Sequence, residues 1–413
     1  MAFQGLPGEQ AMLERSAPRA RSLSSTRGAW IAAGSALSLL TASAIVVAAH
    51  GSFAIALALA GAGFGTAILW ARRTAAQNAL LALTSVSLCL AAAEMGARVL
   101  KPLPSDEHEE STVIAYDPDL GFRPLPNQQA RAQRVFANGM RWTATYTFDE
   151  HGQRAMPESQ ASRCRVAFLG DSFTFGHGLE DDQTIPYQFV KATNDLYRGY
   201  NFAYSGYGAH QMLRAIETGR IERVVGAPLN LVIYQGLIDH LRRIGGGASW
   251  DQHGPRYALL ADGSVKYLGP FHSVPFAAIV EFLFSRSALF HYFYGKLLAI
   301  DPAQAIPLYV AVLKQARDEV ERRYHADFVV VFWDANVYWP TNENAALVKA
   351  VMQRLADAHI QIVPVSAIIP DLEANMAAYS LTPRLDLHPD ATAARLVGQF
   401  LAHQIGLRHC SVG

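Results

Sequence analysis

Three long apolar stretches, separated by short polar breaks, fill most of the first hundred residues. They run over residues 30–49, 52–71 and 78–100. As a helix, each is long enough to cross a hydrocarbon core of about 30 Å, and a cleaved signal peptide would contain only one such stretch. The pattern therefore predicts a three-helix transmembrane anchor over residues 30–100, followed by a chain of mixed, globular composition.

Arginine residues lie on one side of the predicted spans. Four precede the first span and two separate the second from the third: Arg15, Arg19, Arg21, Arg27, Arg72 and Arg73. Because positively charged loops stay cytoplasmic, we expect residues 1–29 to form a cytoplasmic tail and the third span to run outward. The protein is then a multi-pass protein of the inner, cytoplasmic membrane, with its remaining chain on the periplasmic side. Glu94 and Arg98 in the third span are spaced to pair with each other or to reach the interface.

Beyond the anchor, the pattern becomes that of an α/β domain. Residues 101–112 read as an acidic, proline-containing linker, and the domain is expected to cover residues 113–413. Turn residues first alternate with β-prone runs over 116–154, which indicates a small β-rich preface. The predicted strands that follow are 166–169, 200–204, 229–235, 328–333 and 360–365, and the predicted helices are 209–220, 303–323, 344–358 and 390–404. This alternation predicts a doubly wound parallel sheet.

Residues 245–300 interrupt the alternation of strands and helices. They contain a predicted hairpin, 256–268, that turns at Asp262-Gly263, and an aromatic-rich predicted helix, 276–298. We interpret this segment as a cap-like insertion over the site.

Charge and cysteine content narrow the function classes. The chain has 35 basic and 35 acidic residues, so it lacks the basic excess of a nucleic-acid-binding protein. Cys89 falls within a span. Cys164 and Cys410 fall in the exported part, where a disulfide between them and two free thiols both fit. The cysteines and histidines do not have the spacing of a metal site, so we predict no metal and no cofactor.

A serine follows the first predicted strand of the sheet at a tight turn. Residues 165–178 read RVAFLGDSFTFGHG, and Gly170, Asp171 and Ser172 end the apolar run. Open α/β sheets carry their chemistry at the carboxyl ends of their strands. Ser172 is therefore a candidate nucleophile, provided that a histidine and a carboxylate reach it from elsewhere. Taken alone, Asp171 or Ser172 is better explained as a cap of the following helix.

The required histidine and carboxylate occur near the end of the chain. Asp386 and His388 lie in the sequence LDLHP, just before the last predicted helix. Residues two apart in an extended segment face the same way, about 6 to 7 Å apart. His388 can then take the proton of the Ser172 hydroxyl while Asp386 orients the imidazole and stabilises its charged form.

An acyl-enzyme on Ser172 also needs donors for the negative oxygen of its tetrahedral intermediate. The backbone N–H groups of Ser172 and Gly206 are candidates, although Gly206, in YSGYG after the second strand, also fits an ordinary turn glycine. His177 and His210 lie near these blocks, and each fits either a substrate contact or a packing role.

Three blocks in this order resemble a known superfamily. The GDSF block, NFAYSGYG after the next strand and the terminal DLH resemble the SGNH (GDSL-type) hydrolases, and YDPDLGFRPLPN with FDEHGQR is similar to the region before these blocks in membrane-anchored members. The resemblance implies a flavodoxin-like, three-layer α/β/α fold. It also implies Ser172 as nucleophile, Asp386 and His388 as its partners, and Gly206 as an oxyanion donor.

The chain departs from the family pattern at two places. The two-residue spacing of Asp386 and His388 is similar to that of alginate O-acetyltransferase-like members, whereas many other members have Asp-x-x-His. In YQGLIDHLRR, Ile238 occupies the place of the family's oxyanion asparagine. A side-chain donor must then come from Gln235 or His240.

These features favour a membrane-anchored serine ester hydrolase or O-acyltransferase. The expected substrate is an O-acyl, plausibly acetyl, ester of an envelope glycan, and a lipid ester is the next candidate. Transfer from a cytoplasmic acyl donor would need a separate acyl-carrying membrane protein. The alternative from another class is a non-catalytic binding or scaffolding subunit of an envelope polysaccharide assembly, which Ile238 favours and the intact Ser172, Asp386 and His388 oppose.

Overall fold

The structure is a computed structural model, which divides the chain into two compact units. One comprises Met1–Leu103 with Leu283–Phe293, and the other Pro104–Phe282 with Tyr294–Gly413. The structure describes residues 23–48, 52–69, 71, 73–100, 107–112, 114–157, 162–194, 196–273, 287–290, 301–335 and 342–410. Each unit is described by itself.

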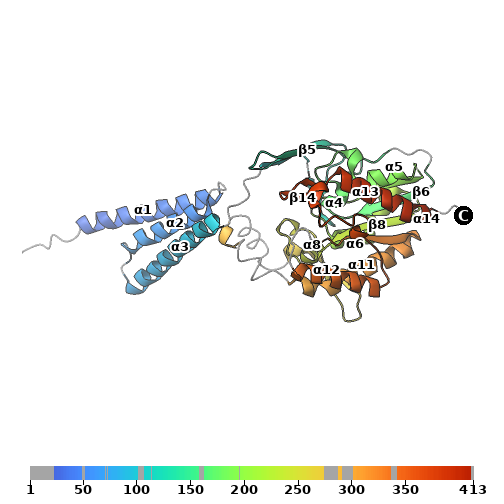
Figure 1. The fold of residues 1–413 in the computed structure, drawn as a ribbon. Coiled ribbons are helices and arrows are strands. Elements are labelled where there is room, and N and C mark those ends of the chain that lie inside the picture. The colour runs from blue at the N-terminus through green and yellow to red at the C-terminus, as the bar shows by residue number, and fades with distance from the viewer. Residues whose placement is uncertain are drawn as a thin grey trace, which may run out of the picture. The chain divides into compact units, whose positions relative to one another are not determined.

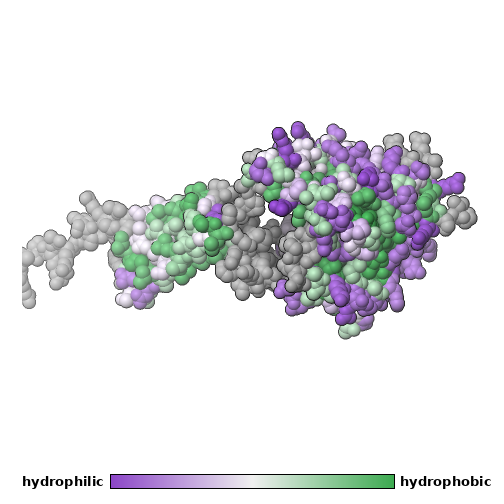
Figure 2. Space-filling model, viewed as in Figure 1, coloured by the Kyte–Doolittle hydropathy of each residue, from purple (hydrophilic) through white to green (hydrophobic). Residues whose placement is uncertain are grey.

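Three helices form the first unit. They are α1 (Leu23–Ala48), α2 (Phe53–Ile68) and α3 (Thr74–Leu100). Gly61 and Gly63 let α2 approach its neighbours closely, because a Cβ at Gly61 would lie 3.0 Å from Leu88 on α3, and one at Gly63 would lie 2.9 Å from Leu40 on α1. Figure 2 shows apolar residues gathered over these helices.

The three helices differ in their capacity to cross a membrane. Within the described part of the chain, α3 is the helix whose length and composition suit a membrane span. The apolar part of α1, Ala33–Val46, and α2 are shorter. The prediction of three helices is thus confirmed, and the prediction that all three are membrane spans stays a prediction.

Glu94 on α3 is buried and makes the predicted pair with Arg98, at 3.0 Å. Its carboxylate also accepts hydrogen bonds from the Ser287 hydroxyl (2.7 Å) and the backbone N–H groups of Ala288 (2.8 Å) and Leu289 (3.0 Å). These residues belong to the segment interpreted from the sequence as a cap. The described part of the predicted helix 276–298 thus contacts α3, and the rest lies outside the described residues.

A five-stranded parallel sheet organises the second unit. Its strands are β6 (Cys164–Leu169), β7 (Tyr197–Asn201), β8 (Leu231–Leu237), β11 (Asp327–Trp333) and β12 (Gln361–Pro364), in the spatial order β12-β11-β8-β6-β7. Numbered along the chain, this is the flavodoxin order 2-1-3-4-5. The order reverses between β6 and β8, so ligands are expected outside the carboxyl end of β6.

Helices cover both faces of this sheet (Figure 1). Alternate residues of β6 explain why: Val166 and Phe168 pack into one apolar core, and Ala167 and Leu169 into the other. One core lies under α5 (Ile185–Ala192) and α13 (Ala391–Leu401). The other lies under α6 (Ala209–Glu217), α7 (Arg220–Val225), α8 (Asp239–Ile244), α11 (Pro302–Tyr324) and α12 (Asn342–Asp357). The predicted three-layer α/β/α arrangement is confirmed.

Small antiparallel elements surround the main sheet. They are the hairpin β2 (Ile114–Asp117) and β3 (Gly121–Pro124), the sheet of β1 (Glu107–Glu110), β4 (Gln129–Val135) and β5 (Arg141–Thr147), the hairpin β9 (Pro255–Leu259) and β10 (Val265–Pro270), and the pair β13 (Ser380–Thr382) and β14 (Asp386–Pro389). The predicted β-rich preface and the hairpin at Asp262-Gly263 are confirmed. The expected linker differs, because β1 lies within it. Its acidic sequence pairs with β4 through backbone hydrogen bonds, which need no apolar periodicity.

A disulfide joins the first strand of the sheet to the end of the chain. Cys164 begins β6, and Cys410 follows α14 (Leu407–His409), with their Cα atoms 5.8 Å apart. Of the two alternatives left open by the sequence, the structure shows the disulfide.

We expect Cys410→Ser to lower the free energy of unfolding by about 3 to 5 kcal/mol, because the bridge closes a long loop and so limits the freedom of the unfolded chain. Chemical denaturation of the full-length protein in detergent measures this. Cys89→Ser, which changes the free and exposed thiol, is the control. Equal stability of the Cys410 variant and the wild type would show that the bridge does not stabilise the fold.

Candidate active site

The turn after β6 places Ser172 at the point where the strand order reverses. Gly170 has a φ of +154°, and a Cβ there would meet the side chains of Thr174 and Gln235 at 2.8 and 2.9 Å, so the turn requires glycine. Asp171 caps the short helix α4 (Ser172–Phe175) by accepting the Phe173 N–H at 3.0 Å. The cap and the candidate nucleophile are therefore adjacent residues with separate partners.

The structure brings the three residues of the predicted triad together. His388 Nε2 lies 2.9 Å from Ser172 Oγ, and His388 Nδ1 lies 2.6 Å from Asp386 Oδ1. An ionised carboxylate only accepts, so Nδ1 carries the proton and Nε2 is left to accept the serine hydroxyl. This is the arrangement in which a histidine can act as the base for a serine nucleophile.

The buried carboxylate of Asp386 has partners from the small preface sheet. Trp142 on β5 donates its indole N–H to Oδ2 at 2.9 Å, and Arg134 on β4 approaches Oδ2 at 3.3 Å. Burial raises the pKa of Asp386, but the hydrogen bonds from His388 and Trp142 outweigh it and hold that pKa well below its usual range. Asp386 therefore stays ionised beside His388.

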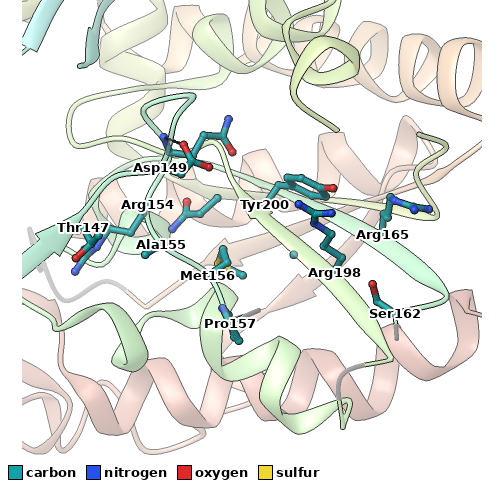
Figure 3. A pocket seen from close by; sticks show the side chains of 13 residues that line it. Thr147, Asp149, Arg154, Ala155, Met156, Pro157, Ser162, Arg165, Arg198 and Tyr200 are labelled. Carbon is teal, nitrogen blue, oxygen red and sulfur yellow. Dashed lines mark hydrogen bonds between the residues drawn. The ribbon is translucent and has the colours of Figure 1, made fainter. Parts of the chain in front are cut away.

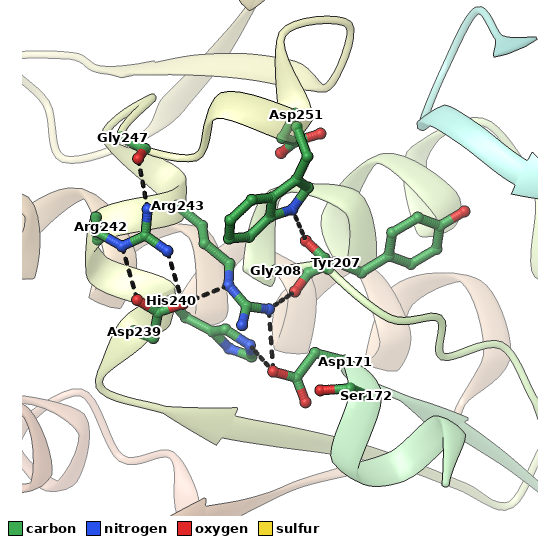
Figure 4. A network of polar contacts seen from close by, with 12 residues as sticks. Asp171, Ser172, Tyr207, Gly208, Asp239, His240, Arg242, Arg243, Gly247 and Asp251 are labelled. Atoms are coloured by element: carbon green, nitrogen blue, oxygen red, sulfur yellow. Dashed lines mark hydrogen bonds and ion pairs between the residues drawn. The ribbon is translucent and has the colours of Figure 1, made fainter. Parts of the chain in front are cut away.

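Gly206 lies on the loop after β7, with a φ of +89°. Arg243 on α8 joins this loop to the serine turn, because its Nη1 donates both to Tyr207 O (2.5 Å) and to Asp171 Oδ2 (3.0 Å), as Figure 4 shows. Asp171 precedes Ser172, and Tyr207 follows Gly206. The same Arg243 nitrogen therefore binds a neighbour of each proposed backbone donor.

The network behind this turn changes the interpretation of His240. Its Nε2 lies 3.2 Å from Asp171 Oδ2 and its Nδ1 lies 2.6 Å from the Tyr234 hydroxyl, and the ring is fully buried. Burial lowers the pKa of His240, against the opposing effect of Asp171, so the ring is neutral. Since both nitrogens have partners, His240 does not offer a donor to an oxyanion, and that prediction is wrong.

The other side-chain candidate differs from His240. Gln235 is buried, and its Oε1 accepts the Asp171 N–H at 3.2 Å, so it supports the serine turn from behind. Its donor, the Nε2 group, has no hydrogen-bond partner among the described residues. Ile238 is half-buried and packs against the apolar core. Gln235 therefore stays a prediction as the side-chain donor, whereas His240 does not fit that role.

Asp171 itself is fully buried, and its carboxylate is bonded to the side chains of His240 and Arg243. Burial raises the pKa of Asp171, but the charge of Arg243 and the bond from His240 outweigh this and hold it well below the usual range. An ionised Asp171 keeps the network intact at neutral pH.

Two histidines left open by the sequence have different surroundings. His177 lies over His388, with ring centroids 4.6 Å apart, and over Trp142, at 4.9 Å. His210 is buried and bonds to Asp251 at 2.6 Å, which is a packing role.

His177, Asp386 and His388 each offer one metal-ligand atom, and these atoms lie within 4.8 Å of one another. The spacing in sequence does not reveal this cluster. Because both ring nitrogens of His388 already contact Asp386 and Ser172, the arrangement fits a hydrolytic triad, and we assign no metal to it.

Arg154, in the block FDEHGQR, supports the candidate site, and the sequence analysis did not identify it. Its buried guanidinium donates to the carbonyl groups of Phe175 (3.0 Å) and Gly176 (2.8 Å) at the end of α4, and its Nε pairs with Asp181 at 2.8 Å. It therefore fixes the far end of the short helix that begins with Ser172.

A cavity of about 650 Å³ lies along the edge strand β7, away from this triad (Figure 3). Arg165, Arg198 and Tyr200 are among its lining residues, and Ser172, Asp386 and His388 are not. Cavity size alone would thus point away from the residues whose geometry supports chemistry.

Comparisons with known proteins found similar solved structures but no matching family model. No protein-family model matches the chain, and the search of curated proteins found no match. Among solved structures, a lipolytic protein of the G-D-S-L family from Veillonella parvula is similar, with 12% identity over 59% of this chain and 99% of that one, at a TM-score of 0.36. One from Desulfitobacterium hafniense has 12% identity over 58% and 99%, at 0.34.

A carbohydrate acetylesterase family member from Sinorhizobium meliloti is also similar, with 11% identity over 59% of this chain and 98% of that one, at a TM-score of 0.35. The sheet order and the helices on both faces define a flavodoxin-like α/β/α domain.

We expect Trp142→Phe to reduce the stability that Asp386 contributes. An acid with a depressed pKa stabilises the fold above its unfolded pKa, near 3.8, and this contribution is lost as the pH falls towards the native value. Without the indole N–H the native pKa rises, so the variant loses about 1.5 to 3 kcal/mol near pH 7 and less at pH 3. Denaturation of the full-length protein at both pH values measures the difference.

Trp333→Phe is the matched control, because the buried indole of Trp333 packs against Phe173 and its N–H has no partner among the described residues. A pH-independent loss of the same size in both variants would contradict the role assigned to Trp142.

Proposed function

We propose that this protein is a serine ester hydrolase or O-acyltransferase. The observation that carries the proposal is the Ser172–His388–Asp386 chain of contacts, at 2.9 and 2.6 Å. His388 takes the hydroxyl proton as Ser172 Oγ attacks the ester carbonyl. The protonated His388 then gives that proton to the leaving alcohol, and an acyl group remains on Ser172. Water releases it as an acid in hydrolysis, whereas a sugar hydroxyl accepts it in transfer.

The oxyanion is expected to rely on backbone donors. The N–H groups of Ser172 and Gly206 serve this role in the proposal, and Arg243 holds their two segments together. Losing one oxyanion donor typically costs about 100- to 1,000-fold in rate. Because Ile238 replaces the asparagine of the family pattern, we expect slow turnover of small unactivated esters.

The proposed substrate is an O-acyl, for example acetyl, ester of an envelope glycan. This part is supported by the spacing of Asp386 and His388, which is similar to that of alginate O-acetyltransferase-like proteins. A lipid ester is the second candidate for the substrate. A non-catalytic binding subunit is the alternative function, and Ile238 is the observation that favours it. Transfer would need an acyl-donating membrane protein as a partner.

We further propose that residues 30–100 anchor the protein in the inner membrane, with residues 113–413 on the periplasmic side. The disulfide between Cys164 and Cys410 supports an oxidising compartment for that part of the chain. The arginines before α1 and between α2 and α3 support the orientation.

Covalent labelling tests the enzyme proposal. The full-length protein in detergent is treated with a fluorophosphonate, and the site of the adduct is mapped by mass spectrometry. We expect an adduct on Ser172 that is absent in Ser172→Ala and at least about 1,000-fold slower to form in His388→Ala, because His388 activates the hydroxyl. Wild-type protein that is folded but does not react would favour the non-catalytic alternative.

Reporter fusion tests the proposed topology. Alkaline phosphatase, which needs periplasmic disulfide formation, is expected to be active when fused after Gly413 and inactive when fused after Arg73. The reverse pattern would show that the predicted orientation is wrong.

A further inference from the structure

Trp250 is a large aromatic side chain left open to solvent beside the candidate active site. Half of it, 50%, is exposed. Its indole N–H donates to the carbonyl oxygen of Gly206 at 3.2 Å. A Cβ on Gly206 would lie 2.8 Å from the indole nitrogen, so the ring rests directly on this glycine. Trp250 therefore lies against the loop proposed to hold the oxyanion.

Buried polar groups fix the chain on which this tryptophan stands. The next residue, Asp251, is buried, and its carboxylate contacts His210 Nε2 at 2.6 Å and Gln211 Nε2 at 2.8 Å. Both partners come from α6, which follows the Gly206 loop. These bonds tie the Trp250 segment to the helix that supports the candidate site, and they explain why His210 is buried.

Two arginine side chains also lie beside the indole. The Arg242 guanidinium lies over the ring at 5.2 Å, and Arg243 lies at 5.8 Å. Contacts that restrict a ring before binding reduce the freedom that it loses when a ligand covers it, which favours binding.

We propose that Trp250 is a stacking platform for the sugar ring that carries the acyl group, an inference that rests on the proposed esterase or acyltransferase function. The C–H face of a pyranose packs against an indole face, while its hydroxyl groups remain free to meet polar neighbours and water. A lipid acyl chain instead requires an enclosed, mostly apolar cavity that covers most of its surface. An open ring flanked by two arginines suits a carbohydrate better.

A binding measurement separates this inference from the catalytic proposal. Full-length Ser172→Ala protein in detergent is titrated with chemically acetylated cellotriose by calorimetry, so that no turnover is needed. We expect Trp250→Ala to raise the Kd about 10-fold, since stacking of this kind contributes on the order of one tenfold step in affinity. Trp250→Phe keeps an aromatic face and is expected to stay within about threefold of the parent.

The phenylalanine variant also distinguishes stacking from support of Gly206, because it lacks the N–H that bonds to Gly206. Leu407→Ala, an equally exposed apolar side chain on α14, is the matched control and is expected to bind as the parent does. An unchanged Kd in Trp250→Ala, or the same loss in the alanine and phenylalanine variants, would overturn the platform.

Kinetics of the Ser172-intact protein on p-nitrophenyl acetate report on the catalytic proposal alone. Absence of this activity together with a Trp250-dependent Kd would reject the enzyme and keep the sugar-binding surface. A third result would be that Trp250→Ala lowers the rate of p-nitrophenyl octanoate hydrolysis and leaves the Kd for acetylated cellotriose unchanged. That result would overturn the sugar platform in favour of a lipid ester.

Discussion

The buried carboxylate of Asp386 is the interaction on which the candidate site depends. It lies at 3% exposure, yet it is held ionised by His388, Trp142 and the nearby Arg134. A buried carboxylate is costly unless hydrogen bonds and charges of this kind surround it. Because Trp142 and Arg134 come from the antiparallel preface, that small sheet is part of the site and not only a lead-in to the parallel sheet.

A second buried carboxylate, Asp171, stabilises the turn that carries Ser172. Asp386 faces the base, whereas Asp171 faces Arg243 and His240 and sets the shape of the turn. Arg243 also holds the Gly206 loop, so one cation spaces the two backbone segments proposed to face the oxyanion. Where the family pattern has an asparagine side chain, this chain has Ile238, and the backbone held by Arg243 and the Gln235 amide are the remaining candidates for the oxyanion donors.

Much of this arrangement was predictable because it depends on short-range patterns. The apolar run before Gly170, the alternation of strands and helices, and the two-residue spacing of Asp386 and His388 each constrain local geometry. Trp142, Arg134, Arg154 and Arg243 were not found because their roles come from long-range contacts. Asp386, for example, lies 244 residues along the chain from Trp142. His240 was assigned a donor role for the same reason, since its sequence neighbours do not reveal that Tyr234 and Asp171 occupy both ring nitrogens.

The disulfide links the two chain segments that carry the residues of the predicted triad. Ser172 follows β6, the strand that begins with Cys164, and His388 precedes α13, after which the chain reaches Cys410. The candidate base and the candidate nucleophile therefore lie on the two segments that the bridge connects. Since a histidine displaced by about 1 Å loses much of its effect, a fold that assembles its site from distant parts of the chain gains from such a constraint. The bridge limits how far the last helix, and His388 before it, can move from the strand that carries the serine.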